Sequence, residues 1–333
     1  MNSQKGPVAV VTGGCGFAGS YLVKSLAERS MRVHLFDTQT TIPGYLNSLT
    51  DNITVHKIDL ANDCQLDTLM ASLNPREIYH LAGIANVKST WNREYLTYQV
   101  NLLGTVNLLS AIRNSRVEAD VLIVSTGEVY GKVDLEHQPI TEMQTVNPRS
   151  PYAASKLSME IAVRQFARQL PNKIVIVRPF NHIGPGQHAG FVTADFAMQI
   201  TQIEREEIPP VIKVGDLSTH RDFTDVRDMI EAYIAALKNG QHMQTYNASS
   251  GKAIQIKTML QWLLNLSDKE IRIVQESSRF PPADIQYLCG SHDFLTRDTS
   301  WEPRRDIRQT LNDILNYWRS LPEGNPAAEI NRS

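Results

Sequence analysis

The sequence has few cysteines, no long apolar run and almost no net charge, and each of these scarcities excludes a class of protein. Its three cysteines, Cys15, Cys64 and Cys289, are odd in number and match no metal-binding spacing, so we expect reduced thiols and no metal site. No apolar stretch approaches the roughly 18 residues of a membrane-spanning helix. A formal net charge of -2 provides no basic surface for a nucleic acid, which we exclude as a partner.

The beginning of the chain and its composition indicate a cytoplasmic globular protein. The apolar run at residues 8–11 is too short for the hydrophobic region of a signal peptide. Reduced cysteines are typical of the cytoplasm. Hydrophobic residues make up 42% of the chain and charged residues 20%, a balance that argues against disorder.

Short runs of β-branched residues alternate with amphipathic stretches through the first half of the chain, which is typical of parallel β-α-β units. The predicted strands are residues 8–11, 33–36, 53–58, 77–81, 121–125 and 174–178. The predicted helices include residues 20–29, 95–113 and 151–170. This pattern predicts an α/β fold with a doubly wound Rossmann parallel sheet, which binds ligands at the carboxyl ends of its strands.

The regular alternation stops after Pro179, where loops rich in glycine, proline and histidine begin. We therefore expect an NAD-binding Rossmann domain over residues 1–179, with a helix at 225–238 that returns to it. Residues 180–321 mainly form a smaller C-terminal substrate-binding lobe in this interpretation. The polar residues 322–333 are expected to form a flexible tail.

Three glycines spaced three residues apart follow the first predicted strand: Gly13, Gly16 and Gly19. Such glycines permit a tight turn and a close approach of a pyrophosphate to the backbone at a helix N-terminus. Asp37 ends the second predicted strand, where a carboxylate can accept hydrogen bonds from the adenosine ribose and repel a 2′-phosphate. This pattern favours NAD(H) over NADP(H). A flexible loop and a solvated aspartate are the alternative interpretations.

A tyrosine and a lysine lie one turn apart at the start of a predicted helix. Ser150 is suited to cap this helix and Pro151 to begin it, which places Tyr152 in the first turn and Lys156 on the same face. The neighbouring ammonium and the helix N-terminus are expected to lower the pKa of the phenol, so that Tyr152 can act as an acid or base. The pair alone is equally compatible with a solvated helix surface.

The fifth predicted strand ends in Ser125 and Thr126, whose hydroxyls can hold a substrate carbonyl oxygen beside the phenol. Simple capping of the strand end is the alternative. These motifs together resemble the extended short-chain dehydrogenase/reductase family, also described as NAD-dependent epimerases and dehydratases. The matching positions are residues 12–19, Asp59, residues 80–83, Asn101, residues 125–131, Tyr152, Lys156, Arg178 and Pro179.

The resemblance implies a catalytic set of Thr126, Tyr152 and Lys156, with Glu128 beside them. It also implies Asp37 at the adenosine ribose and Asp59 near the adenine. Helices near residues 95–113 and 151–170 would form a homodimer through a four-helix bundle. The cofactor-binding residues that it implies are Gly13, Gly16, Phe17, Ala18, Gly19, Asp37, Asp59, Leu60, Leu81, Ala82, Gly83, Asn101, Tyr152, Lys156 and Pro179.

Motifs in the second half are similar to those of GDP-4-keto-6-deoxy-mannose reductases, which reduce the C4 ketone to give GDP-rhamnose. They comprise residues 87–91, 178–187, 190–193, 212–216 and 221–228. The resemblance implies substrate contacts at Val87, Thr126, Asn181, Val192, Lys213, Val214, Arg221 and Arg279. An arginine suits a pyrophosphate because its planar fork donates two hydrogen bonds. For Arg221 the alternative is a surface ion pair with Asp222 or Asp225.

Two departures from the family pattern bear on the reaction and the nucleotide. Related GDP-mannose 4,6-dehydratases carry Asp or Ser after the catalytic Thr, whereas this chain has Gly127, which has no side chain to protonate a leaving hydroxyl. Arg279 lies two residues earlier than the family's diphosphate-binding arginine, so its role and the base stay open. The sequence favours an NAD(P)H-dependent reductase of a GDP-linked sugar. A dehydratase or epimerase is the nearer alternative, and a non-catalytic NAD-binding protein the remote one.

Overall fold

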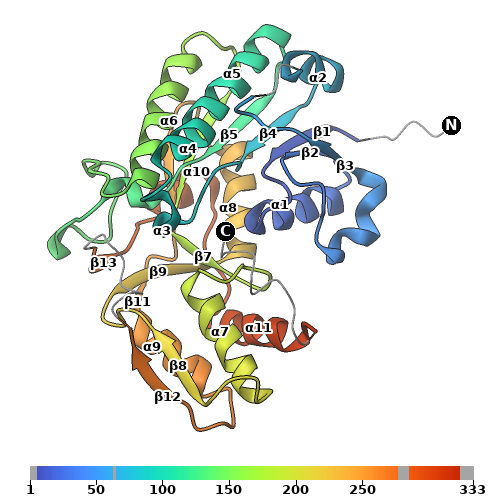
Figure 1. The fold of residues 1–333 in the computed structure, drawn as a ribbon. Coiled ribbons are helices and arrows are strands. Elements are labelled where there is room, and N and C mark those ends of the chain that lie inside the picture. Colours follow the sequence, from blue (N-terminus) through green and yellow to red (C-terminus); the bar gives the residue numbers. More distant parts are fainter. Residues whose placement is uncertain (1–5, 63–64, 277–284, 323–333) are drawn as a thin grey trace.

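A parallel sheet of seven strands forms the centre of the larger lobe in the computed structural model, which describes residues 6–62, 65–276 and 285–322 (Figure 1). The strand order is β10-β6-β5-β4-β1-β2-β3. Six of these strands correspond to the predicted ones: β1 (Val8–Thr12), β2 (Arg32–Asp37), β3 (Ile53–Lys57), β4 (Glu77–His80), β5 (Asp120–Val124) and β6 (Ile174–Pro179).

The seventh strand, β10 (Thr245–Ala248), was not predicted. It follows helix α8 (Val226–Asn239), which crosses the sheet and contacts β5 and β6. Strand β10 then pairs parallel with β6, with Thr245 opposite Ile176. The larger lobe therefore also contains chain from beyond residue 179.

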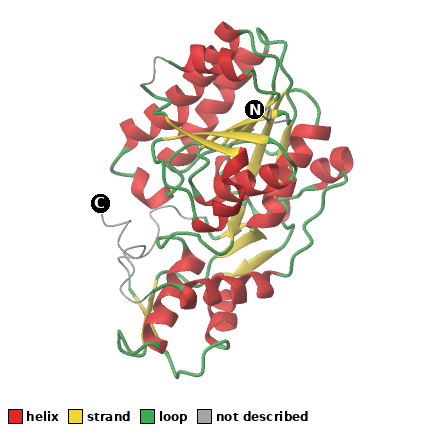
Figure 2. Ribbon diagram, turned by 90° about the vertical axis from the view of Figure 1, so that its right-hand side faces the viewer, coloured by secondary structure: helices red, strands yellow, loops and turns green. Residues whose placement is uncertain are grey.

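Alternate residues of the buried strands point to opposite faces of the sheet, and helices cover both faces (Figure 2). Ala9 and Val11 pack with α1 (Phe17–Glu28) and α8 on one face. Val10 packs on the other face, against a layer of three helices. These helices are α2 (Leu66–Leu73), α5 (Gly104–Ser115) and α6 (Pro151–Ala167).

The predicted helix at 95–113 is divided in the structure. Helix α4 (Glu94–Tyr98) runs into a π-helical turn, η2 (Gln99–Leu103), and then into α5. Helix α6 begins as expected, because the Ser150 side chain accepts a hydrogen bond from the Ala153 amide at the N-cap.

The smaller lobe has its own hydrophobic core, built mainly from three helices: α7 (Val192–Glu204), α9 (Ile256–Leu264) and α11 (Ile307–Ser320). A two-stranded sheet lies beside them, formed by β8 (Val211–Val214) and β12 (Arg272–Gln275). A four-stranded sheet comprises β7 (Asn181–Ile183), β9 (His220–Asp225), β11 (Ala253–Gln255) and β13 (Tyr287–Leu288).

The remaining elements are short: α3 (Val87–Thr90), α10 (Asp293–Thr299), η1 (Gly44–Asn52), η3 (Gly127–Tyr130) and η4 (Leu135–His137). The two lobes are joined by polar contacts at the start of α8. The Asp225 carboxylate caps α8, pairs with Arg227 at 2.6 Å and accepts a hydrogen bond of 2.7 Å from Thr310 on α11. Within the described ranges, no helix combines the length and apolar character needed to span a bilayer.

Candidate active site

The carboxyl ends of four neighbouring strands carry most of the predicted site residues. In the sheet order β5-β4-β1-β2, these ends lead to Thr126, Gly83, the glycine loop and Asp37. Because parallel strands end at the same edge of a sheet, residues far apart in sequence form one continuous row. This row has the arrangement needed to bind an extended dinucleotide.

The loop between β1 and α1 and the first turn of the helix have no room for a side chain at Gly13 and Gly19. Gly13 has φ of +71°, and a Cβ there would lie 2.8 Å from the Ala82 nitrogen. A Cβ at Gly19 would lie 2.0 Å from the Gly13 carbonyl oxygen. Gly16 is the N-cap of α1 and supplies no side-chain cap, while Phe17 and Ala18 begin the helix. The loop thus brings backbone amides to a surface where a pyrophosphate fits.

Asp37 is held in place beside this loop. Its carboxylate oxygens accept hydrogen bonds of 3.0 Å from the backbone amides of Cys15 and Gln39. Asp59, beyond the end of β3, instead accepts hydrogen bonds within its own turn, from the Ala61 amide and the Asn62 side chain. Both carboxylates therefore have fixed positions along the predicted adenosine side of the row.

A buried polar cluster supports the end of β4, where Leu81, Ala82 and Gly83 follow His80. The His80 ring lies 2.7 Å from the hydroxyl of Thr12 on β1 and 2.7 Å from that of Thr105 on α5. Burial lowers the pKa of His80 to about 3, with a further contribution from Lys156, so the ring is neutral and joins three elements.

Asn101 occupies the π-helical turn and is completely buried. Its side chain accepts a hydrogen bond of 2.8 Å from the Ile84 amide and donates one of 2.9 Å to the Ser155 hydroxyl. A Cβ at Gly83 would lie 2.8 Å from Asn101 Oδ1 and 3.3 Å from Lys156 Nζ. The space in front of Lys156 therefore requires glycine.

Tyr152, Thr126 and Lys156 come together at the ends of β5 and α6. The hydroxyls of Tyr152 and Thr126 share a hydrogen bond. The Lys156 ammonium donates a hydrogen bond of 2.9 Å to the Val124 carbonyl oxygen, and only 4% of the lysine is exposed. The structure thus brings together the three residues implied as the catalytic set.

The protonation state of Tyr152 differs from the prediction that its neighbours lower its pKa. Burial raises the pKa of the phenol to about 12, and the nearby Glu128 carboxylate adds to this effect, while the hydrogen bond with Thr126 opposes it. The Lys156 ammonium is directed to the Val124 carbonyl, which explains why helical spacing alone gave the wrong direction. The phenol is therefore neutral near physiological pH.

Glu128 and Arg221 interact across the site. Burial raises the pKa of Glu128, and the charge of Arg221 opposes this shift. The Arg221 guanidinium also donates hydrogen bonds to the backbone oxygens of His220 and Ile285. The alternative ion pair with Asp222 or Asp225 is wrong. Asp222 accepts the backbone amide of Ser250, among others, and Asp225 pairs with Arg227.

Gly127 lies against an aromatic ring. A Cβ at this position would be 3.0 Å from two ring carbons of Phe180, which follows β6. Phe180 also stacks on Tyr130, with ring centroids 6.4 Å apart. A side chain at position 127 would therefore press against a ring that is packed from another side.

The other predicted substrate residues are spread over the smaller lobe and its boundary. Val87 and Val192 begin α3 and α7, and Asn181 is exposed on β7. Lys213 pairs with Glu276 at 2.9 Å, whereas the Val214 side chain is buried in the core of the lobe. Cys64, Arg279 and all but the first residue of the predicted tail lie outside the described residues.

Glu160 was not predicted as a site residue, yet it is buried behind Thr126, Tyr152 and Lys156 and contacts Ser125 and Arg178. A signal was present: Tyr152, Lys156 and Glu160 are each four residues apart and therefore share a helix face.

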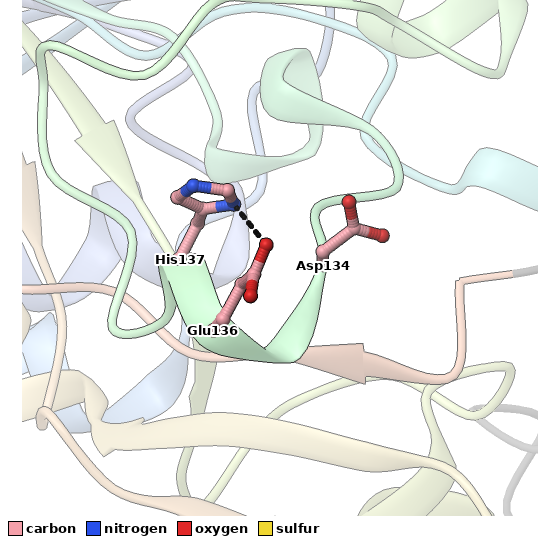
Figure 3. Close-up of side chains that lie close together, drawn as sticks. All are labelled: Asp134, Glu136 and His137. Atoms are coloured by element: carbon pink, nitrogen blue, oxygen red, sulfur yellow. Dashed lines mark ion pairs between the residues drawn. The ribbon is translucent and has the colours of Figure 1, made fainter.

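In the part of the chain that the structure describes, one group of side chains has the spacing of metal ligands: Asp134, Glu136 and His137 (Figure 3). All three are exposed on the single turn η4, with His137 Nδ1 3.9 Å from a Glu136 oxygen. Such a solvated turn needs no ion to balance its charges, and we assign no metal to it.

Comparison with known proteins agrees with this geometry. A family model described as GDP-mannose 4,6 dehydratase matches residues 10–314. The GDP-6-deoxy-D-mannose reductase of Pseudomonas aeruginosa is 35% identical over 310 residues, which cover 93% of this chain and 96% of that protein. The chain belongs to the GDP-mannose 4,6-dehydratase family. The predicted family is therefore confirmed, and with it a relation to enzymes of nucleotide sugars.

Solved structures confirm the predicted doubly wound fold. RMD from Pseudomonas aeruginosa, complexed with NADPH, superposes with a TM-score of 0.80 and 33% identity, covering 94% of this chain and 99% of that one. The UDP-glucose 4-epimerase of Thermus thermophilus, in complex with NAD, superposes with a TM-score of 0.82 and 27% identity, covering 95% and 100%. Reductases and epimerases therefore share this framework.

We expect Gly19→Ala to abolish tight NADH binding, because its methyl group would collide with the Gly13 carbonyl and displace the loop. Isothermal titration calorimetry with NADH measures the effect. The matched control is Gly44→Ala, whose methyl group would have its nearest neighbour at 4.0 Å. Equal NADH affinity in the two variants would contradict the assignment of the loop.

Proposed function

We propose that this chain is an NADH-dependent reductase of the C4 ketone of a nucleotide-linked 4-keto-6-deoxy-hexose, with GDP-4-keto-6-deoxy-mannose as substrate and GDP-rhamnose as product. The relation to the P. aeruginosa reductase supports this substrate class. The observation that carries the proposal is the meeting of Tyr152, in the first turn of α6, with Thr126 at the end of β5, beside the buried Lys156. A reduction needs a proton donor at this position.

The residues of the strand-end row fit a nicotinamide dinucleotide, because the close packing at Gly13 and Gly19 holds the backbone amides of the loop at the strand edge, where a pyrophosphate can bind. When bound, this cofactor supplies the hydride for the ketone carbon. Thr126 would orient the ketone oxygen, and Tyr152 would donate its proton to that oxygen as negative charge develops. Lys156, whose Nζ lies next to Gly83, would hold the nicotinamide ribose.

Asp37 supports NAD(H) as the preferred cofactor, because its fixed carboxylate would repel a 2′-phosphate. NADP(H) is the second candidate, since the related RMD structure contains NADPH. Arg221 is proposed to contact the substrate diphosphate. The bound diphosphate would then compete with the Glu128 carboxylate for the Arg221 guanidinium.

A 4,6-dehydratase is the second candidate function, favoured by the family description and by the buried Glu128 carboxyl. Two observations count against it. Gly127 provides no acid for the leaving hydroxyl, and the Phe180 ring lies where a side chain would begin.

We further propose a homodimer through a four-helix bundle of α5 and α6 with the preceding turns. Large apolar side chains are exposed along this surface at Tyr95, Leu103 and Ile161. Contact with a second copy would remove them from water.

Tyr152→Phe should reduce kcat/KM for NADH-dependent ketone reduction on the order of 10²-fold or more, because it removes the proton donor. The measurement is the loss of NADH absorbance with GDP-4-keto-6-deoxy-mannose. NADH affinity, measured separately, should be nearly unchanged. Wild-type turnover by this variant would exclude the scheme. Conversion of GDP-mannose by the wild type without net NADH consumption would favour the dehydratase, and isomerisation of the keto-sugar without NADH consumption would favour an epimerase.

Ile161→Glu should convert the dimer to a monomer, because it places a charge at the centre of the proposed bundle on a side chain that is 63% exposed in the single chain. Size-exclusion chromatography with light scattering measures the mass. Ile273→Glu is the control, since Ile273 is also exposed but lies on β12 of the smaller lobe. A dimeric Ile161→Glu variant would contradict this interface.

A further inference from the structure

A buried group of charged and polar side chains lies directly behind the catalytic residues. Glu160 accepts two hydrogen bonds from Arg178, of 2.9 and 2.7 Å, and one of 2.5 Å from the Ser125 hydroxyl. Only 1% of Glu160 and 6% of Arg178 are exposed. Burying charges is costly unless they are paired, so this group is a fixed unit of the structure.

This unit is connected to the catalytic set through strand β5. Ser125 lies between Val124, whose carbonyl holds the Lys156 ammonium, and Thr126, which contacts Tyr152. A carboxylate that fixes the Ser125 side chain therefore also fixes the backbone on both sides of it. Glu160 reaches this position from α6, one turn beyond Lys156.

The unit continues away from the site through further hydrogen bonds. Arg178 donates a hydrogen bond of 2.9 Å to the Tyr130 hydroxyl, which donates one of 2.8 Å to Asn247 on β10. The backbone amide of Asn247 in turn donates a hydrogen bond of 2.7 Å to the Glu142 carboxylate. Strands β5, β6 and β10 are thus joined behind the site, and Glu160 is the member of the unit that also acts on Lys156.

We propose that Glu160 is a positioning residue of the reductase site, which holds the end of β5 through Ser125 and balances the buried charge of Lys156. This inference rests on the proposed function for the reaction, but the charge balance belongs to the protein itself and can be tested without substrate.

The charges around Lys156 support this role. Burial lowers the pKa of Lys156 to about 8, and Glu160 raises it. From β4, His80 faces the lysine as a neutral ring, and from η2 the Asn101 amide lies beside Gly83 in front of it. From β6, Arg178 is paired with Glu160 itself. Loss of the Glu160 charge should therefore shift the lysine toward its neutral form at physiological pH.

Glu160→Gln tests this charge balance through protein stability, because glutamine keeps the shape of the side chain. A lysine whose pKa is lower in the folded than in the unfolded state destabilises the fold, and does so increasingly as pH falls below the unfolded value. The variant lowers the folded pKa further. The free energy of unfolding of the variant should therefore fall further below that of wild type at pH values under the wild-type lysine pKa of about 8. Above that pH the difference should be smaller, because both folded proteins carry a neutral lysine.

The measurement is urea unfolding of wild type and variant at about pH 6.5 and about pH 9. The variant's folding equilibrium constant should be lower than that of wild type at both pH values, and the factor should be on the order of tenfold greater at the lower pH. Ser125→Ala is the matched control, since it removes a hydrogen bond to Glu160 and keeps every charge. Its deficit should be the same at both pH values.

Should Glu160→Gln not fold because Arg178 is left unpaired, the double variant Glu160→Gln/Arg178→Met replaces it. This variant removes both charges of the pair, and its deficit should still grow as pH falls. A deficit that is equal at both pH values would show that Glu160 has only a structural role, and would overturn the proposal.

The second readout is the pH profile of NADH-dependent reduction. Activity that needs the Lys156 ammonium declines as pH rises through the lysine pKa. This decline should begin at lower pH in Glu160→Gln and at the wild-type pH in Ser125→Ala. An unshifted profile in Glu160→Gln would also contradict the proposal. If the wild type reduces no keto-sugar, the proposed function fails, while the unfolding measurement still decides the role of Glu160.

Discussion

The hydrogen bond from Lys156 to the Val124 carbonyl joins helix α6 to the end of strand β5, and the geometry of the site depends on it. The lysine is buried, so its ammonium must remain at an acceptor, and this requirement fixes how α6 lies against the sheet. Tyr152, one turn earlier on the helix, is thereby placed beside Thr126. The Glu160 carboxylate, one turn beyond Lys156 and paired with Arg178, provides negative charge behind this contact.

The order of the strands then determines where a ligand can lie. Thr126 follows β5, the glycine loop follows β1 and Asp37 ends β2, so the residues proposed for chemistry and for cofactor binding form a row along one edge. The same framework occurs in the related reductase and epimerase structures. The proposed reduction draws on one local difference: Gly127 follows Thr126, where related dehydratases carry Asp or Ser.

The sequence was sufficient for the features that depend on local patterns. Runs of β-branched residues predicted six strands, and glycine spacing predicted the loop that β1 enters. Strand β10 was missed because its four residues, Thr245–Ala248, include an asparagine that bonds to Tyr130 and carry no apolar run. The direction of the Tyr152 pKa was missed because the i,i+4 spacing with Lys156 gives a shared helix face, but neither the burial nor the acceptor of the ammonium. For Arg221, the alternative ion pair considered only aspartates next to it in sequence, whereas its guanidinium bonds to the Ile285 carbonyl and faces Glu128.

The central claim is that net hydride transfer from NADH reaches the sugar while Tyr152 supplies the proton. The most direct measurement uses NADH deuterated at the transferable C4 position together with GDP-4-keto-6-deoxy-mannose, followed by mass spectrometry and NMR of the sugar. We expect one deuterium at sugar C4 for each NADH oxidised. Product that contains no deuterium, formed while NADH is left unconsumed, would contradict it.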